Sequence, residues 1–276
     1  MSLPLRSLER AAVRFRHLPG LDRADGLWRA VTPVYDAALA SVARDGLVRV
    51  INGTDRVRVL PRCRHISEVY EPATWARLMA EVRPGDTVVD VGASVGLYTL
   101  GFARRVGPTG RMVAFEPDPA SADILAAHVA LNRFEDRVTV RREAVTDQDG
   151  AVAFEAGREV ESHVVAGDLA AGAFSVPSVK LDSVFEGTQV AIVKVDVEGA
   201  EKAVLDGAQR ILRRAEPPRL LAVELHPQSW APSGTTLDTL IGMVQEAGYE
   251  VSDASGDEIK EAHAWTEMFC TRKGAA

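Results

Sequence analysis

The stretch VVDVGASVGLYTL, residues 88–100, decides the fold of this chain. An apolar run is followed by a turn that holds Gly92 and Gly96, and then by residues that favour a helix. A strand, a glycine-rich turn and a helix form the unit with which open α/β sheets hold ligands at the carboxyl ends of their strands. We therefore expect a ligand at this turn.

Strand and helix signals alternate on both sides of this unit. We expect strands at 87–92, 110–116, 137–145, 190–197, 218–226, 249–254 and 267–272. We expect helices over 95–106, from Asp118 to Asn132, over 200–212 and from Leu237 to Gly248. Repeated β-α units that end in two strands, which we expect to be antiparallel, predict an open α/β sheet with helices on both faces. Residues 151–180 break the rhythm and are interpreted as a loop or β insertion near the site.

Residues 1–84 differ from the rest and are interpreted as an N-terminal cap, followed by a ligand-binding domain over 85–276. Helices are expected near 5–17 and 27–43, a hairpin at Asn52-Gly53, and a helix that starts at Pro72. The stretch at 5–17 is interpreted as an amphipathic helix that packs on the domain, with contact to a partner or a membrane surface as the alternative. It lacks the apolar core of a secretory signal, and no run approaches the ~20 apolar residues of a membrane span.

Composition excludes several classes of protein. The net charge of −7 gives no support to a nucleic-acid binder, which would want a basic surface. The two cysteines, Cys63 and Cys270, are far apart, so a disulfide framework is not expected and a reducing, cytoplasmic location fits best. Whether the chain forms a homo-oligomer is left open.

The residues around the turn discriminate between ligands. A dinucleotide turn needs glycine where this chain has Ser94 and Leu97, which disfavours a pyrophosphate. Glu116 ends the next strand and can accept hydrogen bonds from ribose hydroxyls. Asp90 ends the first strand, where a carboxylate would repel phosphate and attract a cation. Together these residues favour S-adenosylmethionine, which has a sulfonium and an ammonium but no phosphate.

With these residues, the sequence resembles the FkbM family of class I S-adenosylmethionine-dependent methyltransferases. The resemblance rests on DVGASVGLYT (90–99), FEPDP (115–119), LN (131–132), LDSV (181–184), VKVDVEGAE (193–201) and VELH (223–226). It implies a Rossmann-like sheet of seven strands in the order 3-2-1-4-5-7-6. It also implies methyl transfer to a hydroxyl oxygen of a sugar or secondary metabolite, with S-adenosylhomocysteine as the product.

The resemblance also implies which residues bind the cofactor. Gly92 and Gly96 would shape the methionine pocket, Asp90 would approach the ammonium end, and Glu116 would take the ribose. Ala144 would offer its backbone to the adenine, with Glu143 beside it. The remaining candidates are Ala93, Ser94, Tyr98, Thr99, Pro117 and Asp196. For Tyr98, packing in the core is an equal alternative.

Candidate catalytic groups gather at the ends of the fourth and fifth strands. Lys194 and Asp196 share a face of one strand, and Glu224 and His226 share a face of the next, because side chains alternate along a strand. Glu198 follows in the turn. His226 is the candidate general base, because an unperturbed imidazole titrates near neutrality. Lys194 lies in an apolar strand, so we expect an ion pair with Glu224 or Glu198, and direct contact with the acceptor or cofactor is the alternative.

Several interpretations stay open beside this one. Asp196, Glu224 and His226 could bind Mg²⁺, although a functional metal is not favoured. Glu201 is expected to help start a helix rather than to react. Trp75, Trp230 or Trp265 could line the acceptor pocket, with Trp230 best placed, whereas His65, His163 and His263 are isolated.

The function also has alternatives. The leading one is a small-molecule O-methyltransferase. The others are an N-methyltransferase or a peptide or protein methyltransferase, an inactive scaffold that only binds the cofactor, and a nicotinamide oxidoreductase. The acceptor itself has no recognisable code in the sequence.

Overall fold

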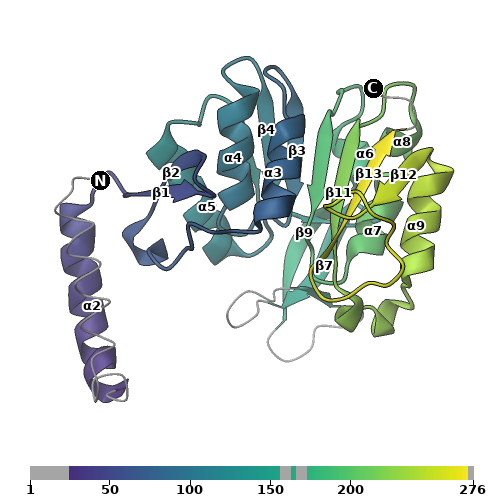
Figure 1. Ribbon diagram of the computed structural model, residues 1–276. Coiled ribbons are helices and arrows are strands. Elements are labelled where there is room, and N and C mark those ends of the chain that lie inside the picture. Colours follow the sequence, from purple (N-terminus) through teal and green to yellow (C-terminus); the bar gives the residue numbers. More distant parts are fainter. Residues whose placement is uncertain (1–24, 156–162, 166–172, 273–276) are drawn as a thin grey trace. The chain divides into compact units, whose positions relative to one another are not determined.

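The computed structural model describes residues 25–155, 163–165 and 173–272 (Figure 1). The chain divides into two compact units, 1–70 and 71–276. The helix that starts at Pro72, predicted as part of the cap, therefore lies in the second unit. In the described residues, every helix is too short or too polar to cross a membrane.

The first unit contains a helix and a hairpin. Helix α2 (Asp25–Val42) is followed by β1 (Leu47–Ile51), β2 (Asp55–Val59) and the short 3-10 helix η1 (Pro61–Cys63). The hairpin confirms the prediction from Asn52-Gly53. Both turn residues have positive φ, at 47° and 74°, which asparagine and glycine tolerate best. The helix expected over 5–17 lies outside the described residues.

The second unit is built on a seven-stranded sheet (Figure 1). From one edge to the other its strands are β5 (Val138–Arg141), β4 (Arg111–Phe115), β3 (Thr87–Val91), β10 (Ile192–Val195), β11 (Leu220–Leu225), β13 (Thr266–Arg272) and β12 (Tyr249–Ser252). Numbered along the chain, this is the order 3-2-1-4-5-7-6. Strand β13 is antiparallel to both neighbours, and the other six strands all run in the same direction.

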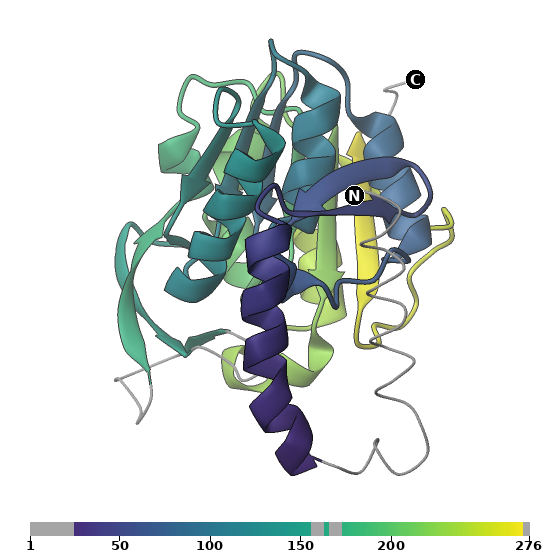
Figure 2. The same ribbon diagram turned by 90° about the vertical axis from the view of Figure 1, so that its left-hand side faces the viewer.

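Helices cover both faces of this sheet. On one side lie α3 (Pro72–Glu81), α4 (Leu97–Val106) and α5 (Pro119–Asn132), of which α4 and α5 stand in front of the strands in Figure 2. On the other lie α6 (Leu181–Val184), α7 (Glu201–Asp206), α8 (Gln209–Arg213) and α9 (Leu237–Glu246). Helix α5 begins as predicted, with the Asp118 carboxylate accepting from the Ser121 backbone N–H at 2.8 Å.

The two faces of the sheet differ in chemistry. Apolar residues such as Val91, Val195 and Val223 pack with α7, α8 and α9 in one buried core. Their neighbours along the strands point to the opposite face, because side chains alternate. There the register aligns Asp90 with Lys194, and Glu224 with Glu267. The face toward α3 and α4 therefore carries buried charge near the carboxyl ends of the parallel strands.

A second sheet contains the end of one predicted strand and the strands of the described part of the predicted insertion. The strand expected at 137–145 ends at Arg141, and Ala144–Val145 forms a separate strand, β6. This strand pairs with β9 (Phe174–Val179) in a sheet that also holds β7 (Gly150–Glu155) and β8 (His163–Val165). The described part of the insertion is therefore β structure. The prediction of one strand was wrong because pairing with β9 redirects the chain after Arg141.

The single helix expected over 200–212 is also two helices, α7 and α8. They are separated at Gly207 and Ala208. A Cβ atom at Gly207 would lie 2.0 Å from the backbone oxygen of Thr146. The close approach of these two backbones requires glycine, a residue that weakens a helix interior, and the helix is interrupted there. Apolar periodicity alone does not reveal this contact.

Candidate active site

The turn after β3 is held by contacts within the protein. A Cβ at Gly92 would lie 1.7 Å from the Asp196 backbone oxygen, and one at Gly96 would lie 2.2 Å from Leu125 Cδ1. Both glycines have positive φ, at 77° and 90°. The backbone N–H groups of Gly92 and Ala93 donate to the Phe115 carbonyl. Both glycines are thus required for tight packing of the turn against the ends of β4 and β10 and against α5.

Asp90 lies beneath this turn and is almost completely buried. Its Oδ2 accepts a hydrogen bond from Thr99 Oγ1 at 2.6 Å. Its Oδ1 is buried and has no hydrogen-bond partner among the described residues. Burial raises the pKa of Asp90, although the nearby Lys194 ammonium opposes this effect. Thr99, for which contact with the cofactor is predicted, is also the hydrogen-bond donor to the Asp90 carboxylate.

Glu116 follows β4 and faces the same turn. Its Oε2 accepts from the Ser94 backbone N–H at 2.7 Å, and its Oε1 accepts from the Asp118 N–H at 2.8 Å. Burial raises the pKa of Glu116 to about 7, although the two backbone N–H groups oppose the shift. Ser94 itself is exposed and has a positive φ of 48°. Glu116 therefore tethers the turn to β4.

Tyr98 is part of the core, one of the two roles expected for it. Its ring lies 5.0 Å from that of Trp75, and its hydroxyl donates to Glu71 Oε2 at 2.6 Å. The remaining cofactor candidates lie at the ends of β4 and β5. Pro117 is half-buried, Ala144 is buried in β6, and the half-buried Glu143 carboxylate is ion-paired with Arg141.

Lys194 is the buried cation of the charged face. Its Nζ donates to Asp196 Oδ2 at 3.1 Å, so the partner expected from the sequence, Glu224 or Glu198, is replaced by Asp196. The ammonium also lies 4.6 Å from the centre of the Tyr98 ring. Burial alone would lower the pKa of Lys194. The surrounding carboxylates outweigh this effect and raise the pKa well above its usual value.

His226 is fully buried and surrounded by carboxylates. Its Nδ1 lies 2.7 Å from Glu201 Oε1. Its Nε2 lies 3.4 Å from Glu198 Oε2 and 3.8 Å from Asp196 Oδ1, but has no hydrogen-bond partner within the described parts of the chain. Burial lowers the pKa of His226, but the neighbouring carboxylates raise it to about 9. With a pKa of about 9, the imidazole of His226 is protonated at neutral pH.

Glu201 holds this part of the site together. It is the first residue of α7, as expected for a helix start. Its carboxylate also accepts from the Gly199 backbone N–H at 3.0 Å and from Trp230 Nε1 at 2.9 Å. Together with His226, these contacts tie the ends of β10 and β11 to the loop after β11.

A third group of carboxylates joins β11, β13 and the residue before α3. Glu224 and Glu267 are paired across the two strands, and both are buried. Burial raises the pKa of Glu224 to about 8 and that of Glu267 to about 7. Glu71 lies close enough that one oxygen from each of the three carboxylates is within 4.8 Å of the others.

The three residues predicted as an alternative Mg²⁺ site therefore fall into two different groups in the structure. Asp196 and His226 form a set with Glu198, whose ligand atoms lie within 4.8 Å of one another, whereas Glu224 belongs to the set with Glu71 and Glu267. Sequence reasoning missed Glu71 and Glu267, because no motif connects them. The one available signal was a glutamate inside the apolar strand EMFC.

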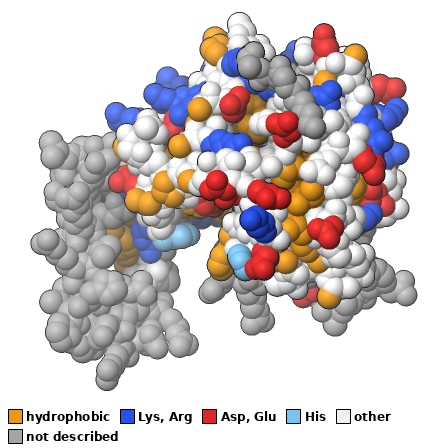
Figure 3. All heavy atoms as spheres, turned by 45° about the vertical axis from the view of Figure 1, so that its right-hand side comes forward, with side chains coloured by type: hydrophobic (Ala, Val, Ile, Leu, Met, Phe, Trp, Pro, Cys, Tyr) orange, Lys and Arg blue, Asp and Glu red, His pale blue; other side chains and the backbone are white. Residues whose placement is uncertain are grey.

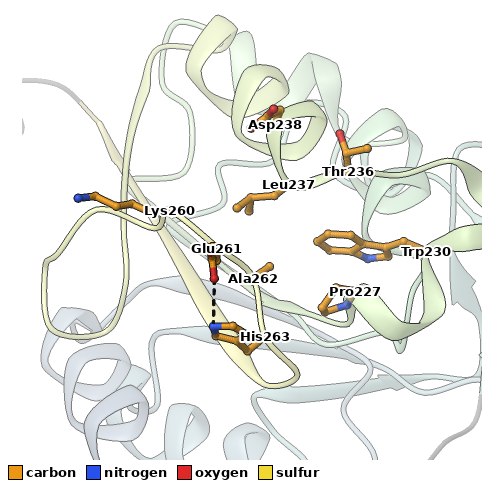
Figure 4. A pocket seen from close by; sticks show the side chains of 9 residues that line it. All are labelled: Pro227, Trp230, Thr236, Leu237, Asp238, Lys260, Glu261, Ala262 and His263. Atoms are coloured by element: carbon orange, nitrogen blue, oxygen red, sulfur yellow. Dashed lines mark ion pairs between the residues drawn. The ribbon is translucent and has the colours of Figure 1, made fainter.

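An open pocket of about 410 Å³ lies beside the charged groups (Figure 4). It is lined by Pro227, Trp230, Thr236, Leu237, Asp238, Lys260, Glu261, Ala262 and His263. Trp230 points into it and also contacts Glu201, so this pocket is joined to His226 by two hydrogen bonds. Figure 3 shows hydrophobic side chains exposed between acidic ones on one face of the molecule.

The other aromatic and histidine candidates lie elsewhere. Trp75 is buried in the core, and Trp265 is 75% exposed. His65 is exposed in the first unit. His263 is exposed on the rim of the pocket, where it lies 3.8 Å from Glu261. The side chain of His163 lies outside the described residues. Of the three tryptophans, Trp230 thus has the position expected of a pocket residue.

Comparison with known proteins agrees with this architecture. The profile of the methyltransferase FkbM domain matches residues 90–251. The 31-O-demethyl-FK506 methyltransferase FkbM of Streptomyces tacrolimicus is 37% identical over 83 residues, 30% of this chain and 31% of that protein. The methyltransferase sdnD of Sordaria araneosa is 25% identical over 201 residues, 60% of this chain and 74% of that protein. The match to the Streptomyces protein thus spans about a third of its length.

A solved structure was also matched. The methyltransferase FkbM of Methylobacillus flagellatus KT aligns with a TM-score of 0.45 and 19% identity, over 67% of this chain and 43% of that chain. The fold is that of the class I S-adenosylmethionine-dependent methyltransferases. Because the family profile covers more than half of its 276 residues, the chain belongs to the FkbM methyltransferase family.

Proposed function

We propose that the chain transfers a methyl group from S-adenosylmethionine to a hydroxyl oxygen of a small molecule. The family supports methyl transfer. The choice of oxygen is supported by the name of the Streptomyces relative, a 31-O-demethyl-FK506 methyltransferase. The observation that carries the proposal is the arrangement of Asp196, Glu198 and His226 at the carboxyl edge of the sheet, where a hydroxyl proton can be accepted.

The residues of the turn fit the cofactor. The buried Asp90 Oδ1 lacks a donor among the described residues and is suited to the ammonium group of S-adenosylmethionine. Glu116 uses each carboxylate oxygen once, and each oxygen has a further lone pair for a ribose hydroxyl. Gly92, Gly96, Ala93, Ser94 and Pro117 would frame the cofactor, with Tyr98, Glu143, Ala144 and Asp196 around it. When bound, S-adenosylmethionine supplies an electrophilic methyl group.

The chain's own residues then have to orient the acceptor and take its proton. We assign contact with the hydroxyl to Asp196 and Glu198, whose side chains are 26% and 23% exposed. His226 is fully buried behind them, so we assign it a positioning role that replaces the direct base role expected from the sequence. Lys194 fixes the Asp196 carboxylate, and Glu224 lies 3.8 Å from His226 Nε2.

The open pocket is the proposed site for the body of the acceptor. Trp230, Leu237, Pro227 and Ala262 offer apolar contacts, and Asp238 and Lys260 offer polar ones. A partly apolar acceptor with hydroxyl groups, such as a secondary metabolite, suits this mixture.

Transfer of a labelled methyl group tests the proposal. The full-length protein is incubated with methyl-labelled S-adenosylmethionine and matched hydroxyl, amine and peptide acceptors, and NMR locates the label. We expect a methyl ether on a hydroxyl acceptor. Label on nitrogen or on a peptide would contradict the choice of oxygen. Cofactor binding without transfer to any acceptor would support the scaffold alternative, and binding of NAD in place of S-adenosylmethionine would support an oxidoreductase.

A further inference from the structure

The charged face of the sheet carries more negative charge than its basic groups offset. Lys194 and His226 are two cations on this face. The carboxylates around them interact electrostatically with one or both cations or, in the case of Glu71, lie close to carboxylates that do. These carboxylates are Glu71, Asp90, Asp196, Glu198, Glu201, Glu224 and Glu267. Buried carboxylates without a counter-charge are costly, so a further positive charge is expected there.

Glu267 is the least satisfied of these groups. Its side chain is more than nine-tenths buried. In the part of the chain that the structure describes, neither of its two oxygens has a hydrogen-bond partner. It lies opposite Glu224 on the neighbouring strand, so two carboxylates face each other away from water. An arrangement of this kind needs a shared proton or a cation between the carboxylates.

The geometry suits a metal ion. One oxygen from each of Glu71, Glu224 and Glu267 lies within 4.8 Å of the others. Hard divalent cations bind carboxylate oxygens at roughly 2.0–2.6 Å, so ligands on opposite sides of one ion are roughly 4–5 Å apart. All three ligands are carboxylates, the set that Mg²⁺, Mn²⁺ and Ca²⁺ prefer. Glu71 is only half-buried, which leaves a side open for water ligands.

The other acidic set is less suited to an ion. There Asp196 already accepts from Lys194, and His226 is already bound to Glu201 through Nδ1. The Lys194 ammonium would repel a metal ion nearby. Asp196 contacts this ammonium at 3.1 Å and offsets its positive charge. In Glu267, by contrast, neither carboxylate oxygen has a hydrogen-bond partner among the described residues, and the sheet brings it opposite Glu224.

We propose that Glu71, Glu224 and Glu267 bind a single divalent cation of the Mg²⁺, Mn²⁺ or Ca²⁺ class. The ion joins the ends of β11 and β13 to the residue before α3. It also fixes Glu224, whose Oε1 lies 3.8 Å from His226 Nε2. Its three ligands differ from the residues of the methyl-donor turn and from Asp196 and Glu198, so binding of the ion does not depend on the proposed function.

Binding of Mn²⁺ tests this site without any acceptor. The full-length protein is first treated with a chelator, and free Mn²⁺ is then measured by electron paramagnetic resonance during a titration. We expect one Mn²⁺ per chain, displaced by Mg²⁺ or Ca²⁺. Glu267→Gln and Glu71→Gln should each weaken binding at least about tenfold. Glu71 is half-buried, so its variant keeps a test available if the Glu267 variant does not fold.

Glu250→Gln is the matched control, because Glu250 is an exposed glutamate on the neighbouring strand β12. It should bind Mn²⁺ as the wild type does, and circular dichroism should show that all the variants fold. The proposal is overturned if the wild type binds no stoichiometric Mn²⁺, which would leave a shared proton between the carboxylates. It is equally overturned if His226→Asn abolishes binding while Glu267→Gln and Glu71→Gln retain it.

Discussion

Glu224 and Glu267 lie directly opposite each other on β11 and β13, and both side chains are more than nine-tenths buried. The ammonium of Lys194, on the neighbouring strand β10, acts on both carboxylates. Two like charges in this position are unfavourable unless a cation balances them. This unfavourable pair lies at the carboxyl edge of the sheet, beside the proposed acceptor site.

Lys194→Met should therefore destabilise the protein strongly. Removing one partner of a buried ion pair leaves an uncompensated carboxylate, which costs about 3–5 kcal/mol. Urea unfolding measures the loss. Lys202→Met is the matched control, because Lys202 pairs with Asp206 at 2.7 Å but both side chains are 37% exposed. That exposed pair contributes about 0.5 kcal/mol or less. Equal losses in the two variants would show that Lys194 does not balance the buried carboxylates.

Gly92→Ala should disrupt the turn after β3. The added Cβ would lie 1.7 Å from the Asp196 backbone oxygen, so β3 and β10 would have to separate. Gly107→Ala is the control, since Gly107 also has a positive φ, at 68°, but a Cβ there meets no atom within 4 Å. The control should lose about 1–3 kcal/mol from backbone strain alone. A thermal melt in which Gly92→Ala loses no more than this would contradict the close approach seen here.

Thr99→Val should destabilise the protein, because the buried Asp90 carboxylate would lose a hydrogen bond. The change keeps the shape of the side chain but removes the hydroxyl that donates to Asp90 Oδ2. A buried carboxylate that loses its donor costs about 1–3 kcal/mol. Urea unfolding of this variant is compared with that of Thr109→Val, at an exposed threonine. The same stability in both variants would mean that the Thr99 hydroxyl does not stabilise Asp90.

Cofactor affinity should depend on pH through Glu116. Its folded pKa is about 7, raised by burial from 4.5, and the ionised form accepts ribose hydroxyls best. Calorimetry with S-adenosylhomocysteine should show Kd rising about tenfold from about pH 8 to about pH 6. Glu116→Gln should remove this dependence. A pH profile that is the same in the wild type and the variant would contradict the role of Glu116.

The raised pKa of Glu116 also makes the folding stability depend on pH. The unfolded chain loses the Glu116 proton at lower pH than the folded protein does, because the folded pKa is the higher of the two. Glu116 therefore stabilises the unliganded fold least above about pH 7, and its contribution falls as pH rises from about 4.5 to about 7.

Much of the fold could be predicted from local patterns. Apolar runs and Asn52-Gly53 are short-range signals, and they predicted the strands, the hairpin and the antiparallel finish. The break at Gly207 could not be predicted, because its cause is the backbone of Thr146, a residue distant in the sequence. The strand at 137–145 was predicted too long for a similar reason, since β9 pairs with its end.

The candidate site, like the fold, could be predicted only where its residues lie within local motifs. Asp90, Glu116 and His226 lie within motifs, and the structure brings His226 close to Asp196 and Glu198. Glu71 and Glu267 lie outside any motif. They come together only because β13 inserts beside β11 and because α3 begins at the same edge. The carboxylates around His226 also changed an expectation, since an imidazole that titrates near neutrality was predicted and these carboxylates raise the pKa of His226 to about 9.

The most direct test of the account is the rate of methyl transfer by Glu198→Gln, measured together with its affinity for S-adenosylhomocysteine. Glu198 is assigned to the acceptor side, so affinity should stay within about twofold of the wild type while the transfer rate falls at least about a hundredfold. A transfer rate equal to that of the wild type would contradict the account. So would a fall in rate matched by an equal loss of affinity for S-adenosylhomocysteine.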